Sequence, residues 1–156
     1  MRLGGYDYSR AGAYFITACA GDRKCLFGVI EEDEMHLNHI GNSVESCWLE
    51  IPAHFPNAAL DAFVAMPNHV HGILLLNNVG AGHARPLPVI IGSFKSAVTR
   101  QAGFSVWQRS YRERILRNET ELNQARRYID DNPARWSADK DNPANVHRAT
   151  FVPNRP

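Results

Sequence analysis

The segment Ala65-Met-Pro-Asn-His-Val-His-Gly-Ile-Leu-Leu-Leu76 constrains the fold more than any other part of this chain. Its apolar run over 73–76, and the β-branched Val70 between two histidines, predict a β-strand. Side chains two residues apart in a strand point to the same face, so His69 and His71 project together while Val70 packs behind them. Two neutral imidazoles held side by side on a sheet can supply two ligands to a divalent cation.

A pair of histidines two residues apart is by itself a weak signal, because on an exposed strand such residues are more often solvated or hydrogen-bonded than bound to a metal. A second segment, 127–133, strengthens the metal interpretation. Tyr128 and Asn132 stand four residues apart in it and therefore share one face of a helix. The tyrosine can simply pack and form a hydrogen bond, or it can act as a covalent nucleophile on a phosphodiester.

Composition and length fit one globular domain. The chain has 156 residues, of which 44% are hydrophobic and 21% are charged, which is enough for a real core. No apolar run is long enough to span a membrane, and the first residues lack the apolar stretch of a signal peptide. We therefore expect a cytoplasmic protein that associates with the nucleoid. Three cysteines without Cys-x-x-Cys spacing predict reduced thiols.

Charge is distributed unevenly along the chain. Residues 28–66 contain seven acidic residues and no Lys or Arg, whereas residues 95–127 contain eight basic and three acidic ones. Most of these bases are arginines with aromatic residues between them, which suits a polyanion with stackable bases, although a solvated helix face is the alternative. The aromatic N-terminal segment is either a nucleic-acid-contacting arm or an ordered terminus. The residues predicted to contact DNA are Tyr6, Tyr8, Lys95, Arg100, Arg109, Arg112 and Arg127.

The order of expected elements predicts the fold class. Strands are expected at 13–20, 27–30, 35–40, 60–66, 69–76 and 105–110. Helices are expected to open at Asn42 or Ser43, to span 87–103, and to run from the Asn118 cap to Pro133. The short link at 67–68 makes its flanking strands antiparallel neighbours or one kinked strand. We therefore expect an α+β domain, with an antiparallel sheet and helices mainly on one face, over residues 1–136, followed by a loosely packed tail over 137–156.

The run Met66-Pro-Asn-His-Val-His-Gly72 resembles the His-hydrophobic-His motif of the single-tyrosine HUH transposases, and most of all that of the REP-associated tyrosine transposases. Further segments follow the order of that family along nearly the whole chain: Gly5-Tyr-Asp-Tyr8, Tyr14-Phe-Ile-Thr17, Gly92-Ser-Phe-Lys-Ser96, Trp107-Gln-Arg-Ser-Tyr111 and Tyr128-Ile-x-x-Asn-Pro133. One departure concerns 112–114, Arg-Glu-Arg, where the family often has an acidic residue and a histidine. This departure leaves the metal and nucleophile positions intact and affects DNA contacts nearby.

The resemblance implies a fold, a site and a substrate. The fold is the ferredoxin-like HUH endonuclease fold. His69, His71 and Asn132 are implied as ligands of Mg²⁺ or Mn²⁺, and Tyr128 as the nucleophile that forms a 5′-phosphotyrosine. The implied substrate is single-stranded DNA with hairpin-forming palindromic repeats, which is cut and rejoined by a monomer or a homodimer. Two alternatives stay open: a non-cleaving regulator of the same fold that binds structured nucleic acid, and a metal-dependent hydrolase that uses water instead of tyrosine.

Overall fold

A four-stranded antiparallel sheet forms the centre of the computed structural model, which describes residues 11–77 and 84–145. The strands lie in the order β4-β5-β1-β6. Their bounds are Gly12–Cys19 for β1, Ala58–Met66 for β4, His69–Leu76 for β5 and Arg112–Leu116 for β6. A separate two-stranded sheet pairs β2, Gly28–Glu31, with β3, Glu34–Leu37.

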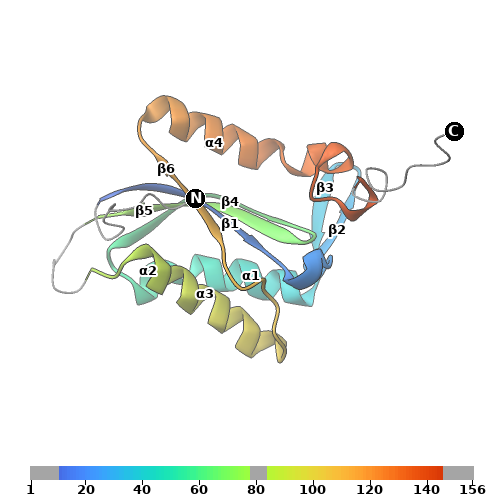
Figure 1. Cartoon of the computed structure of the whole chain (residues 1–156), viewed down its shortest axis with the longest axis horizontal. Coiled ribbons are helices and arrows are strands. Elements are labelled where there is room, and N and C mark those ends of the chain that lie inside the picture. Colours follow the sequence, from blue (N-terminus) through green and yellow to red (C-terminus); the bar gives the residue numbers. More distant parts are fainter. Residues whose placement is uncertain (1–10, 78–83, 146–156) are drawn as a thin grey trace, which may run out of the picture.

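Helices cover both faces of the central sheet (Figure 1). On one face lie α1 (His39–Leu49), α2 (Ile51–His54) and α3 (Leu87–Ala102). On the other face lies α4 (Glu119–Asp131), which continues into the 3-10 helix η2 (Pro133–Ala138); a further 3-10 turn, η1, spans Gly21–Arg23. The expected α+β class with an antiparallel sheet is confirmed. No helix in the described ranges is long and apolar enough to cross a membrane.

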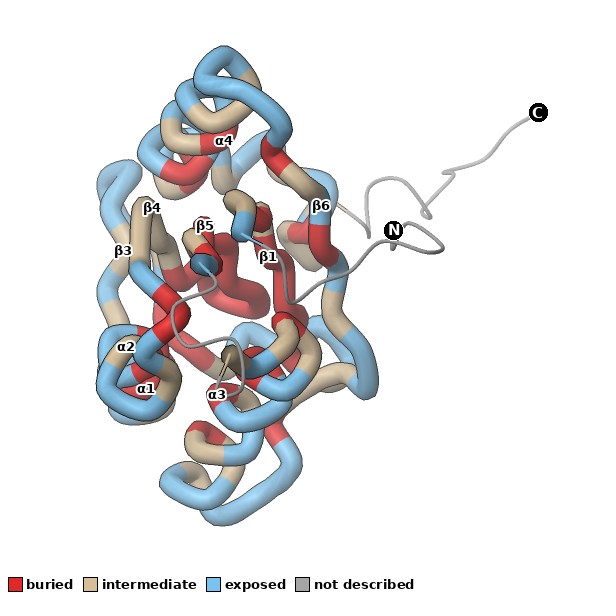
Figure 2. The backbone as a smooth tube through the Cα atoms, turned by 90° about the vertical axis from the view of Figure 1, so that its left-hand side faces the viewer, coloured by how far each residue is buried: buried red, intermediate tan, exposed pale blue. Residues whose placement is uncertain are grey.

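Alternation along the strands divides the interior into two clusters, and the buried strands run between the two helical layers in Figure 2. The larger cluster joins Tyr14 and Val70 of the sheet to Trp48 of α1. The smaller cluster lies under α4 and comprises Ile73, Leu116, Ala125 and Ile129. Because side chains two residues apart share a face, the odd-numbered residues of β5, the two histidines among them, face α4.

Close packing behind the histidines depends on Gly72. A Cβ added at Gly72 would lie 2.3 Å from Cζ2 of Trp48. That indole is fully buried, and it stacks on Phe63 with 5.0 Å between ring centroids. A glycine directly after His71 therefore lets the largest side chain of α1 rest on the strand that carries the histidines.

The first long helix begins earlier than the sequence predicts. Asn38 is the N-cap of α1, and its side-chain oxygen accepts a hydrogen bond from the backbone N–H of Gly41 at 2.9 Å. The amide of Asn38 also donates to the carbonyl of Leu26 at 2.9 Å. The predicted start at Asn42 or Ser43 is wrong, because Asn38 caps the helix directly after β3. His39 consequently belongs to the helix and not to a strand over 35–40.

The strand predicted at 105–110 is also wrong, because the edge strand of the sheet is β6. The segment 105–110 is a loop that touches the sheet through an isolated bridge between Trp107 and Ala20. Its backbone makes two bonds near the end of β1, from the N–H of Gln108 to the carbonyl of Cys19 at 2.9 Å and from the N–H of Gly21 to the carbonyl of Val106 at 2.8 Å. The Lys95 amine of α3 donates to two further carbonyls of the loop, those of Gln108 and Ser110, at 2.8 and 3.3 Å. The β-branched and aromatic residues of this loop thus pack without forming a strand ladder.

The helix that carries Tyr128 and Asn132 forms as predicted. Asn118 caps α4 by accepting from the N–H of Glu121 at 2.9 Å, and Asn132 is the C-cap before Pro133. Arg126 of α4 reaches across to Asp61 of β4 with two hydrogen bonds of 2.8 and 2.7 Å. The short turn at 67–68 joins β4 and β5 as antiparallel neighbours, which is the first of the two arrangements that the sequence left open.

Candidate metal and nucleophile site

Two buried histidines of β5 lie side by side on the face of the sheet that α4 covers. The exposed fractions of His69 and His71 are 0% and 4%, and their ring centroids are 4.7 Å apart. Pairing of β5 with β1 places His71 opposite Thr17 and His69 opposite Cys19. The alternation of side chains along one strand therefore places the two imidazoles next to each other. Neighbouring side chains determine how each ring is oriented.

Asn68 fixes which nitrogen of His69 carries the proton. The amide nitrogen of Asn68 donates to the carbonyls of Arg23 and Asp141 at 3.2 and 2.7 Å, so its side-chain oxygen is left as an acceptor. That oxygen lies 2.8 Å from Nδ1 of His69, so in the neutral ring Nδ1 is the donor and Nε2 carries the lone pair. Nε2 has no hydrogen-bond partner within residues 11–77 and 84–145.

His71 is held in a similar way. Its Nδ1 lies 2.9 Å from Oγ1 of Thr17, and its Nε2 is buried without a partner in the described part of the chain. Burial lowers the pKa of His69, and burial together with His69 and Arg112 holds the pKa of His71 well below its ordinary value. Both rings are therefore neutral at pH 7, which is the form that binds a metal.

Asn132 adds a third buried donor atom. Its amide nitrogen donates to the carbonyl of Tyr128 at 3.3 Å, one helical turn earlier, while its Oδ1 has no partner among the described residues. Buried polar atoms are nearly always paired, so three such atoms on His69, His71 and Asn132 need an explanation. Two imidazole nitrogens and one amide oxygen are an appropriate donor set for a divalent cation, and these residues fit one.

Tyr128 stands beside this donor set with its side chain open to solvent. The tyrosine is 41% exposed, and its ring lies 5.3 Å from that of His71 and 6.0 Å from that of Phe15, edge-on to both. It lines a cavity of about 300 Å³ between α4, β1 and β6. The other residues that line this cavity are Phe15, Thr17, His71, Arg112, Glu113, Arg114, Lys140 and Asp141.

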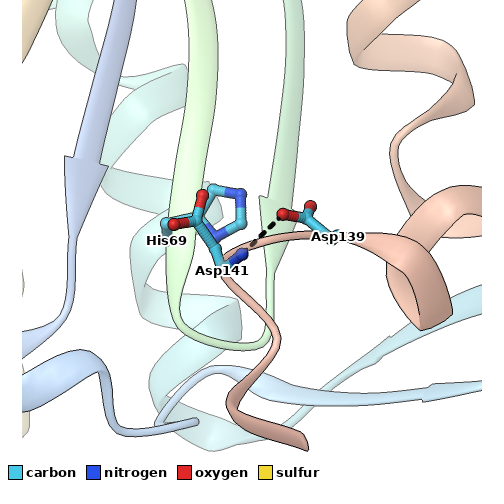
Figure 3. Close-up of side chains that lie close together, drawn as sticks. All are labelled: His69, Asp139 and Asp141. Atoms are coloured by element: carbon cyan, nitrogen blue, oxygen red, sulfur yellow. Dashed lines mark hydrogen bonds between the residues drawn. The ribbon is translucent and has the colours of Figure 1, made fainter. Parts of the chain in front are cut away.

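An acidic pair beyond η2 also reaches the histidines. A ring nitrogen of His69 and carboxylate oxygens of Asp139 and Asp141 all lie within 4.8 Å of one another (Figure 3). Neither aspartate was predicted as a site residue, because residues 137–156 were expected to form a loosely packed tail. Their spacing of two residues was the available signal, and it was weak. In the structure, Asp141 is 5% exposed and its backbone is bonded to Asn68.

The residues predicted to contact DNA lie in different places. Arg112 lines the cavity beside Tyr128, and Arg127 is exposed on α4. Lys95 and Arg100 line a separate cavity of about 460 Å³ next to α3, where the Lys95 amine bonds the 105–110 loop. Arg109 is exposed in that loop. The predictions for Tyr6 and Tyr8 fall outside the described residues.

Comparisons with known proteins find a sequence relative and several solved structures of similar fold. No family model matches the chain. An uncharacterised protein of Haemophilus influenzae is 38% identical over 162 residues, which cover 90% of each chain. A REP-associated tyrosine transposase, solved bound to a REP hairpin, superposes with a TM-score of 0.67 at 19% identity, over 97% of this chain and 89% of that one.

A Deinococcus radiodurans protein assigned as a transposase superposes with a TM-score of 0.52, at 19% identity, over 84% of this chain and 97% of that one. Identities this low bear on the fold and not on the chemistry, so the resemblance noted in the sequence is confirmed at the level of the fold. The chain therefore belongs to the same family as the Haemophilus influenzae protein and has the fold of the REP-associated tyrosine transposases.

Proposed function

We propose that this protein is a divalent-metal-dependent endonuclease and strand transferase that cuts single-stranded DNA at hairpin-forming repeats through a 5′-phosphotyrosine on Tyr128. The observation that carries the proposal is the set of three buried, unpartnered donor atoms, Nε2 of His69, Nε2 of His71 and Oδ1 of Asn132, within the described residues. Their helix and strand bring an exposed tyrosine directly beside them. A protein that only binds nucleic acid does not need this combination.

Each residue has a distinct task in this chemistry. Mg²⁺ or Mn²⁺ bound to the donor set would polarise the scissile phosphate and stabilise the charge that develops on it. Asn68 and Thr17 hold the two imidazoles in place. Asn132, through its bond to the Tyr128 carbonyl, couples the donor set to the backbone that carries the nucleophile.

The covalent step exchanges one phosphodiester for another. The Tyr128 oxygen loses its proton to solvent and forms a bond to phosphorus, while the bond from phosphorus to the 3′ oxygen breaks. That oxygen takes up a proton and leaves as a free 3′ hydroxyl. Since the phosphotyrosine ester retains the energy of the broken phosphodiester, a 3′ hydroxyl can reverse the reaction and rejoin strands without ATP.

The surroundings of the cavity support a nucleic-acid substrate. Arg112, Arg114 and Lys140 supply positive charge around it, and the Arg114 guanidinium lies 5.5 Å from the centre of the Phe15 ring. Arginine heads bind phosphate, and an aromatic ring gives an unpaired base a face to stack on. The similar transposase solved with a REP hairpin makes a hairpin-bearing single strand the substrate to test first.

The test is a denaturing gel of the protein incubated with Mn²⁺ and single-stranded DNA libraries that carry hairpins. We expect wild type to form a covalent protein–DNA adduct, and Tyr128→Phe and His69→Ala to form none. Two matched controls, Tyr111→Phe and His54→Ala, change the same residue types outside the cavity and should keep the adduct. Cleavage that persists in Tyr128→Phe would show hydrolysis by water, and binding without any adduct would show a regulator.

A further inference from the structure

We propose that Asp139 and Asp141 bind the divalent cation together with His69, so that the segment after η2 supplies the negative charge that His71 and Asn132 do not have. The inference rests on the proposed function, because it concerns the same cation. Two imidazoles and an amide are all neutral, whereas hard cations such as Mg²⁺ and Mn²⁺ favour carboxylate oxygens. Within the described residues, the acidic pair places two such oxygens close to a ring nitrogen of His69.

The spacing suits one ion. Cation–oxygen and cation–nitrogen distances are about 2.0–2.5 Å, so two ligands on opposite sides of one ion stand about 4–5 Å apart. The candidate atoms of His69, Asp139 and Asp141 all lie within 4.8 Å of one another. In Figure 3 both aspartates come from one stretch of chain that passes close to the strand carrying His69.

His69 gives an independent indication of a ligand. The residue is 0% exposed, and its Nδ1 is hydrogen-bonded to the side-chain oxygen of Asn68. Its Nε2 has no hydrogen-bond partner within the described ranges. Carboxylate oxygens cannot satisfy the lone pair of a neutral imidazole nitrogen, because both groups are acceptors. A cation between them satisfies all three groups at once.

The chain builds this arrangement with one asparagine. The oxygen of Asn68 orients His69, and the amide of Asn68 donates to the carbonyl of Asp141 at 2.7 Å. The N–H of Asp141 donates to Oδ1 of Asp139 at 2.8 Å, which links the two aspartates to each other. Histidine and carboxylates are thus positioned by the same short network, and not by chance proximity of a tail.

A structural role for Asp141 is the competing explanation. Its carboxylate lies 3.2 Å from Nη1 of Arg23, with side chains that are 7% and 50% exposed, respectively. If that ion pair were the purpose of Asp141, removing either partner would have the same effect. If Asp141 binds a cation, Arg23 is a competing positive charge, and its removal must not weaken cation binding.

The experiment measures Mn²⁺ affinity of the full-length protein without DNA, by electron paramagnetic resonance of free Mn²⁺ and by calorimetry. We expect Asp139→Asn and Asp141→Asn each to weaken binding by at least about tenfold. Arg23→Gln should bind as tightly as wild type or more tightly. Glu45→Gln, which removes a carboxylate from the opposite face of the sheet, should leave the affinity unchanged. Circular dichroism verifies that each variant is folded.

The outcomes separate this inference from the proposed function. Wild-type affinity in both aspartate variants, or equal losses in Asp141→Asn and Arg23→Gln, would overturn the role of the aspartates. If the aspartate variants bind normally while His71→Ala and Asn132→Ala lose Mn²⁺, the cation is bound by the proposed donor set without the aspartates. Loss in the aspartate variants with full binding in His71→Ala and Asn132→Ala supports the inference and removes the ligand set of the proposed function. A wild type that binds no Mn²⁺ overturns the inference.

Discussion

The side-chain oxygen of Asn68 lies 2.8 Å from Nδ1 of His69, while the amide of the same side chain bonds the backbone of Asp141. One asparagine in a two-residue turn therefore sets the tautomer of a buried imidazole and anchors the segment behind it. Residues that orient a metal-binding histidine in this way contribute to affinity without touching the ion.

Replacing Asn68 should lower the affinity of the protein for a divalent cation. In Asn68→Ala the Nδ1 proton of His69 loses its acceptor, so the ring is free to turn. We expect Mn²⁺ affinity to fall about 10–100-fold, measured by calorimetry. The control is Asn57→Ala, since Asn57 is also buried and bonds Arg85 at 3.2 and 3.4 Å, away from the site. A similar loss of affinity in that control would contradict the argument.

Adding one methyl group at Gly72 should make the folded protein less stable. A Cβ there would meet Trp48 at 2.3 Å, so either the indole or β5 has to move. We expect Gly72→Ala to lower the free energy of unfolding by about 1–3 kcal/mol, measured by urea denaturation. Gly92→Ala is the matched control: it lies in α3 with no atom within 4 Å of its added Cβ, so it should be neutral or stabilising. Equal stabilities would show that Trp48 moves freely.

In the proposed function, Tyr128 should act on the cation site of its own chain. The rings of His71 and Tyr128 lie 5.3 Å apart within one molecule, and α4 packs on the sheet of that molecule through Ile73 and Ile129. A mixture of Tyr128→Phe and His71→Ala proteins should therefore form no more DNA adduct than either variant does on a denaturing gel. Recovery of the adduct in the mixture would show that α4 is exchanged between subunits.

Acid should remove the contribution of the ion pair between α4 and β4. The hydrogen bond from Arg126 holds the pKa of Asp61 below its ordinary value. A carboxyl group with a lowered pKa in the folded state stabilises the fold above its unfolded-state value, which is about 4, and that contribution disappears as the pH falls through the folded-state pKa.

Wild type should consequently be more stable than Asp61→Asn at neutral pH, and the difference should vanish in strong acid, as measured by thermal melts across a pH series. Asp131→Asn serves as the comparison, because its partner Arg135 lies 3.8 Å away and both side chains are more than half exposed. Exposed pairs of this kind contribute little. A difference between wild type and Asp61→Asn that does not change with pH would disprove the assignment to charge.

Local pattern was enough to predict the strand and the helix that hold the candidate site. The period of two in β5 identified which residues share a face with His69 and His71, and helical spacing placed Asn132 one turn after Tyr128. Both signals operate over a few residues, so they do not depend on the rest of the fold. The Asn118 cap and the short turn before His69 were predictable for the same reason.

The partners of these residues were not predictable, because they come from distant parts of the chain. Thr17 meets His71 through the register of β1 against β5, and the sequence alone contains no measure of that register. Asp141 reaches Asn68 across 73 residues. The two errors in secondary structure have a similar origin: Asn38 and Asn42 are equally good caps, and the 105–110 loop is tied down by Lys95 of another element.

The alternation of β5 also links cation binding to correct folding. A slip of one residue in the pairing of β5 would turn His69 and His71 toward Trp48 and bring Val70 and Gly72 under α4. Such a misaligned sheet would have no donor set. In the proposed function, a cation that binds the native pairing alone would stabilise it by mass action. Metal concentration during synthesis would then favour the correct strand register as well as the chemistry.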